Sequence, residues 1–112
     1  MPPLGQYSTL EKTHSLEFLK TFHGMLEFES VTEREQMFDV LQAAFKHNYL
    51  EVSQFAGDLG FSPSSVYRWL DGRGLPHKAV WPRVVEWIRT ELETVIARYR
   101  AEIKAYAASG DD

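Results

Sequence analysis

Four histidines are the side chains best suited to metal or acid–base chemistry, but their spacing predicts neither. They are His14, His23, His47 and His77, so no two of them are four residues apart, and no HExxH pattern occurs. Zinc sites on helices depend on such spacings. The chain also contains no cysteine, which excludes thiolate ligands and disulfides. We therefore expect no metal site and no cofactor.

Catalytic motifs are missing as well. Gly72 and Gly74 flank Arg73, but the Gly-Lys-Ser/Thr ending of a phosphate-binding P-loop does not follow. Serine, histidine and acidic residues are scattered along the chain without the grouping of a catalytic triad. We therefore expect no catalytic residue, and a binding protein rather than an enzyme.

Positive charge is unevenly distributed along the chain. Residues 62–89 contain five basic and two acidic side chains, whereas residues 1–40 contain three basic and seven acidic ones. The 112 residues carry a net charge of −4 and are 44% hydrophobic, as expected for one globular domain. The local positive excess permits contact with a polyanion, although the net charge does not favour it.

The stretch over residues 50–72 has the signals of two short helices joined by a tight turn. Ala56 is small enough to lie where two helices cross, and Gly60 can adopt a left-handed conformation at little cost. Ser62 is a good N-cap, and Pro63 suits the first helical position. We expect Phe61 and Val66 to pack inward and the second helix to be exposed on its other face.

This stretch resembles the helix-turn-helix of the lambda-repressor/Cro-like superfamily. The family pattern is a small residue, three spacers, a glycine, five spacers, an aliphatic residue and a terminal glycine. Here these are Ala56, Gly60, Val66 and Gly72. The Arg-Gly-Leu-Pro sequence at 73–76 resembles the loop after the family's second helix. The chain departs from the family at Val52, where glutamine is common.

The resemblance implies that the second helix of the motif enters the major groove of double-stranded DNA. Its exposed side chains would contact base edges, and arginine is suited to guanine O6 and N7; these side chains are Ser64, Tyr67 and Arg68. Short polar and basic side chains would contact phosphates; these are Gln54, Ser62, Ser65, Arg73 and Lys78. Structural alternatives are an N-cap for Ser62, packing on a neighbouring helix for Tyr67 and plain solvation for Arg68.

Apolar spacing predicts helices on both sides of the motif. One is expected from about Ser15 to Glu29, with an apolar stripe at Leu16, Leu19, Phe22 and Leu26. A second starts at Thr32, which forms a capping-box pattern with Glu35, and ends near residues 47–48. We interpret the Pro2-Pro3 opening with Gly5, and residues 109–112, as frayed ends.

A long last helix is expected from Pro82 to about Ala107, with no glycine or proline between them. Its far half outruns the core of a small domain and needs another surface to cover its apolar side chains. A second copy of the chain would supply that surface, so we expect dimerisation through Val95, Ile96, Tyr99, Ile103 and Tyr106. The competing arrangement is that the first helix covers them within one chain.

The sequence therefore predicts an all-α fold of five or six helices with a central helix-turn-helix and a long C-terminal helix. Residues 1–31 form an N-terminal extension, 32–92 the DNA-binding domain and 93–112 a dimerising extension. The expected function is that of a dimeric, sequence-specific regulator of transcription. We expect it to be cytoplasmic and nucleoid-associated, since no signal or membrane segment stands out. The alternative is a protein-interaction adaptor or antitoxin-like subunit, which would bind a regulatory protein partner.

Overall fold

The computed structural model describes residues 4–109, with side chains from residue 10 to residue 108. Five α-helices and one short 3₁₀ helix follow one another, and no strand occurs within these residues. The all-α prediction with a long C-terminal helix is confirmed. The elements are α1 (Leu4–Phe28), α2 (Arg34–Phe45), α3 (Val52–Leu59), α4 (Pro63–Leu70), η1 (Lys78–Val80) and α5 (Trp81–Ser109).

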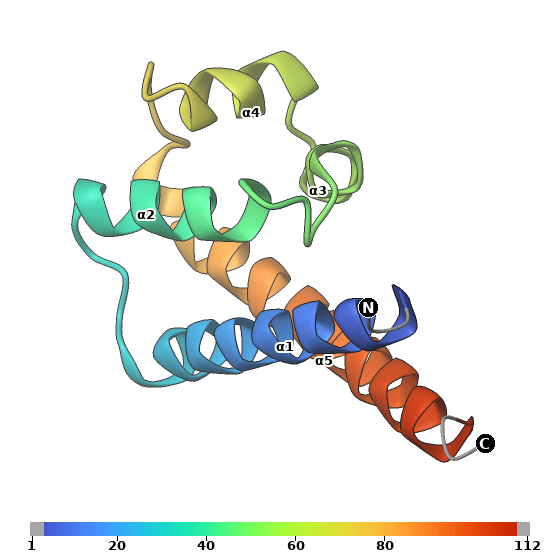
Figure 1. Cartoon of the computed structure of the whole chain (residues 1–112). Coiled ribbons are helices and arrows are strands. Elements are labelled where there is room, and N and C mark those ends of the chain that lie inside the picture. Colours follow the sequence, from blue (N-terminus) through green and yellow to red (C-terminus); the bar gives the residue numbers. More distant parts are fainter. Residues whose placement is uncertain (1–3, 110–112) are drawn as a thin grey trace.

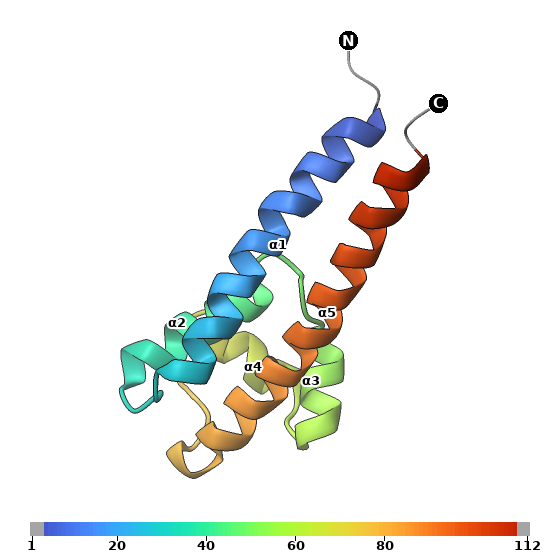
Figure 2. The same ribbon diagram turned by 90° about the horizontal axis from the view of Figure 1, so that it is seen from below.

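The helices are arranged as a head and a hairpin (Figure 1). We call α2, α3 and α4 the head, and the long antiparallel pair α1 and α5 the hairpin. Figure 2 shows the start of α1 and the end of α5 at the same end of the hairpin. None of the helices over residues 4–109 combines the length and the apolar character that crossing a membrane requires.

Helix α1 begins at Leu4 rather than near Ser15, so the expected frayed start is wrong for the residues that the structure describes. Gly5 lowers helix stability by only about 1 kcal/mol relative to alanine, and α5 lies along this part of α1. An ion pair of 2.9 Å between Lys12 and Glu102 joins the two helices there. Residues 1–3 and 110–112 lie outside the described residues, and Ser109 still belongs to α5.

Helix α2 begins one residue later than the capping box predicts. Its N-cap is Glu33, which has an extended backbone (φ −105°, ψ 150°). The side chain of Gln36, not that of Glu35, accepts hydrogen bonds of 2.9 Å from the amides of Thr32 and Glu33. The helix ends at Phe45 rather than at residues 47–48.

One hydrophobic core joins the head to the hairpin. It contains Leu19 from α1, Leu41 from α2, Phe55 from α3, Val66 from α4 and Ile88 from α5, and each of them is fully buried. The core therefore includes residues from both long helices of the hairpin and from all three helices of the head. This continuity fixes the position of α4 relative to the rest of the chain.

The far half of α5 is covered within the chain, so the expectation that it lacks an internal partner is wrong. Helix α1 lies alongside α5. Val95 and Ile96 are 5% and 8% exposed, and Tyr99, Ile103 and Tyr106 are half-buried. Their role in dimerisation stays a prediction. The reason given for it, a far half of α5 without a partner in its own chain, no longer applies.

Candidate nucleic-acid interface

The turn between α3 and α4 has the left-handed conformation that the sequence predicts. Gly60 has φ 78° and ψ 25°, and it caps the C-terminus of α3. The amides of Gly60 and Phe61 both donate to the carbonyl oxygen of Ala56, the latter at 2.8 Å. A Cβ at Gly60 would meet no atom within 4 Å, so the need for glycine comes from the backbone conformation and not from lack of space.

Helix α4 begins as predicted at a serine cap. Ser62 Oγ accepts from the amide of Ser65 at 3.2 Å and donates to Ser65 Oγ at 2.8 Å, and Pro63 follows it at the start of the helix. The N-cap alternative for Ser62 is thus confirmed, and its phosphate contact stays a prediction. Ser65 is half-buried, which leaves less of it accessible than of Ser62.

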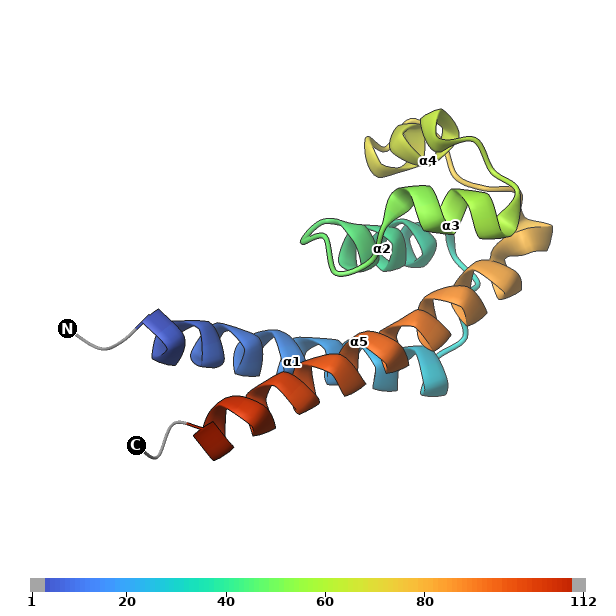
Figure 3. The ribbon, with the colours of Figure 1, turned by 90° about the vertical axis from the view of Figure 1, so that its right-hand side faces the viewer.

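The outer face of α4 carries the three residues predicted to contact bases. Ser64, Tyr67 and Arg68 are three and four residues apart, so they share one face, and all are exposed. Tyr67 is 56% exposed, so more than half of its surface is not covered by a neighbouring helix. Figure 3 shows α4 at the side of the molecule opposite the hairpin, with α2 and α3 between them.

Two contacts that the sequence did not predict hold α4 against α2 and against the turn that precedes it. The Gln42 side-chain amide of α2 donates to the carbonyl oxygen of Leu70 at 2.6 Å, at the end of α4 where carbonyls lack helical partners. Trp69 packs edge-on against Phe61 with ring centroids 5.0 Å apart. Phe61 in turn packs on the buried Phe55, with ring centroids 5.7 Å apart, in agreement with its predicted inward packing.

The predicted phosphate-binding residues come from α3, from the cap and first turn of α4, from the loop after α4 and from η1, and they differ in their contacts. Gln54, Arg73 and Lys78 are all exposed. The Arg73 guanidinium donates to the Asp71 carboxylate at 2.9 Å, and Lys78 Nζ lies 5.6 Å from the centre of the Trp81 ring. An exposed ion pair contributes about 0–1 kcal/mol, so Arg73 can exchange Asp71 for another anion at low cost.

Part of the positive excess over residues 62–89 lies away from α4. Arg89 donates to both carboxylate oxygens of Glu86 at 2.8 and 2.7 Å, and this hydrogen bond raises the pKa of Arg89. Arg89 lines a hollow beside the end of α1 together with Phe28. The exposed basic side chains of this segment are Arg68, Arg73, Lys78 and Arg83, and of these Arg68 lies on α4 itself.

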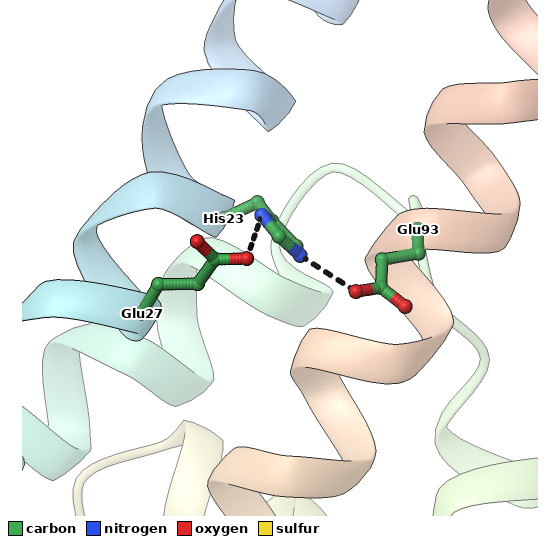
Figure 4. A group of neighbouring side chains, drawn as sticks. All are labelled: His23, Glu27 and Glu93. Carbon is green, nitrogen blue, oxygen red and sulfur yellow. Dashed lines mark hydrogen bonds and ion pairs between the residues drawn. The ribbon is translucent and has the colours of Figure 1, made fainter.

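A second group of polar residues, missed by the sequence analysis, bridges the hairpin (Figure 4). His23 Nδ1 lies 3.4 Å from Glu27 on α1, and His23 Nε2 lies 3.2 Å from Glu93 on α5. The signal in the sequence is the spacing of four residues between His23 and Glu27. One ring nitrogen of His23 and one carboxylate oxygen from each glutamate lie within 4.8 Å of one another. A single ion would need both carboxylates beside the same ring nitrogen, but here each carboxylate lies beside a different one. The arrangement is a polar bridge between α1 and α5, with a hydrogen bond between His23 Nε2 and Glu93, and the expected absence of a metal stays a prediction.

Comparison of the chain with models of protein families, with curated proteins and with solved structures gives no match.

Proposed function

We propose that the protein binds double-stranded DNA sequence-specifically, with α4 in the major groove. The observation that carries the proposal is the exposed row Ser64, Tyr67 and Arg68 on a capped helix that follows a left-handed glycine turn. The same turn and spacing underlie the resemblance to the lambda-repressor/Cro-like helix-turn-helix. In that motif the second helix presents its side chains to base edges.

Each side chain has a definite part in this proposal. Arg68 donates two hydrogen bonds to guanine O6 and N7, which discriminates against other bases by about 1–3 kcal/mol. Ser64 and Tyr67 contact neighbouring base edges or thymine methyl groups. Phosphates are held by hydrogen bonds and charge around α4, from Gln54, Ser62, Ser65, Arg73 and Lys78.

The protein acts as a dimer that raises or lowers transcription. One recognition helix buries too little surface for strong selectivity, and a dimer reads two half-sites about 34–36 Å apart. A regulator of this kind works on the nucleoid in the cytoplasm.

Selection from a randomised duplex pool tests the proposal. We expect the full chain to enrich a motif with two related half-sites and to bind it at least about 1,000-fold more tightly than random duplex of the same length. Binding measured by fluorescence anisotropy should weaken as salt is raised. A pool that remains random after repeated rounds, with no binding at low salt, would contradict DNA binding.

The phosphate contacts have a matched control within the basic segment. Arg73→Ala and Lys78→Ala should each weaken selected and random duplexes alike and flatten the slope of log K against log salt by about 1. Arg89→Ala removes the same charge from the hairpin, beside Glu86, and should leave the slope unchanged. Equal slopes in all three variants would move the DNA contact away from α4.

An adaptor that binds another protein is the second candidate, favoured by the net charge of −4. Such a protein would pass through heparin at low salt and show no salt-dependent binding to random duplex. Retention on heparin that salt reverses, together with duplex binding, favours the DNA-binding function.

A further inference from the structure

Four of the five exposed large hydrophobic side chains that the structure describes lie on α1. They are Leu10, Phe18, Met25 and Phe28, which are 54%, 41%, 48% and 86% exposed. At 3.6 residues per turn their positions fall within an arc of about 80°. They form one stripe along the helix, which we call the α1 stripe.

The α1 stripe continues into a groove between α1 and α2. The groove has a volume of about 380 Å³, and its apolar lining includes Phe18 and Met25 from α1, Val31 from the connecting loop and Val40 and Ala43 from α2. The ring of Phe18 stacks on Phe22, with centroids 6.1 Å apart, which fixes one wall of the groove. The apolar surface is therefore broader than the four side chains alone.

The area of this surface meets the lower limit for a specific interface between two copies. The four side chains of the α1 stripe leave about 500 Å² in water, estimated from their exposed fractions and ordinary side-chain areas. Patches of about 300–600 Å² are the largest on typical monomers and are often interfaces. Two copies that meet through this surface bury about 1,000 Å² in total, which is the least that a specific interface requires.

We propose that a second copy of this chain docks on the α1 stripe and its groove; this rests on the proposed function. Two half-sites require a second α4, so the DNA-binding surface is incomplete without another copy. The surface of α5 expected to recruit it is covered by α1, and the α1 stripe is the large apolar surface that remains. The groove is lined by residues of α1, α2 and the loop between them and by none of α4, and α4 lies opposite the hairpin (Figure 3), so two copies that meet there leave both α4 helices uncovered.

Sedimentation velocity of the full chain tests this interface. We expect the wild type to be a dimer at about 10 µM, and Met25→Glu and Phe28→Glu each to raise the dimer dissociation constant at least about tenfold. Circular dichroism should be unchanged, because both side chains are exposed. The matched control is Tyr67→Glu, which places the same charge at the fifth exposed hydrophobic residue, on α4. This variant should remain dimeric.

The outcomes separate this interface from the proposed function. A monomeric wild type, or a dimer that survives both α1 substitutions, overturns the interface, and DNA selection by that protein would still support the function. Monomeric Met25→Glu that keeps its affinity for random duplex but loses most of its affinity for the selected site supports the interface. A dimer disrupted by the α1 substitutions but unable to bind any duplex keeps the interface and rejects DNA binding.

Discussion

The α3–turn–α4 segment and the α1–α5 hairpin are held by different kinds of interaction. Each helix of the segment has eight residues, which is too short to be stable alone, and its ends are fixed by Gly60, Ser62 and Pro63. The hairpin helices have 25 and 29 residues and are held by contacts between residues far apart in sequence. Local chemistry thus shapes the proposed DNA-binding surface, and long-range packing supports it.

The largest effect is expected from the buried side of α1. Leu19→Ala should lower the free energy of unfolding by about 2–5 kcal/mol, because Leu19 is fully buried and its loss leaves a cavity. Urea unfolding should show the same loss by circular dichroism and by fluorescence of the tryptophans near the head, since one core joins both regions. Glu17→Ala, exposed on the same helix, is the control. An unchanged fluorescence transition in Leu19→Ala would mean that hairpin and head unfold independently.

The next largest effect is expected in the turn between α3 and α4. Gly60→Val should destabilise the protein by about 1–3 kcal/mol and weaken DNA binding, because a β-branched side chain resists a φ of 78°. Space is available at this position, so Gly60→Asn, which tolerates the left-handed region better, should recover most of the loss. Equal stability of the valine variant and the wild type would show that the turn is not left-handed.

A smaller effect is expected where α2 meets the end of α4. Gln42→Ala removes the bond to the Leu70 carbonyl and should cost about 1 kcal/mol. Amide hydrogen exchange should increase mainly in α4 rather than in the hairpin. An increase spread evenly over all helices would show that this bond does not position α4.

The smallest effect is a gain in stability. Gly57→Ala on α3 should stabilise the protein by about 0.5–1 kcal/mol, since Gly57 is helical and exposed and a Cβ there meets no atom within 4 Å. Thermal unfolding provides the measurement. A loss of stability would indicate that α3 needs the flexibility of glycine at this position.

The difference between local interactions and long-range packing explains how much of the structure the sequence predicts. Three predicted features depend only on neighbouring residues: the left-handed Gly60, the Ser62 cap and the exposed row on α4. All three are present in the structure. The early start of α1 depends on α5, more than 70 residues away, and the Gln42–Leu70 bond on a contact between separate helices. The capping box lies one residue later than predicted because Gln36, whose side chain can act at N3 as a glutamate does, accepts from the amide of Glu33.

The most direct test of sequence-specific binding through α4 compares two duplexes in one variant. Arg68→Ala should lose about 1–3 kcal/mol of affinity for the selected duplex and almost none for a random duplex of equal length. Stability should be unchanged, because Arg68 is exposed. Anisotropy titrations at one salt concentration give both values. Equal losses on the two duplexes, or no loss on either, would contradict base recognition by this helix.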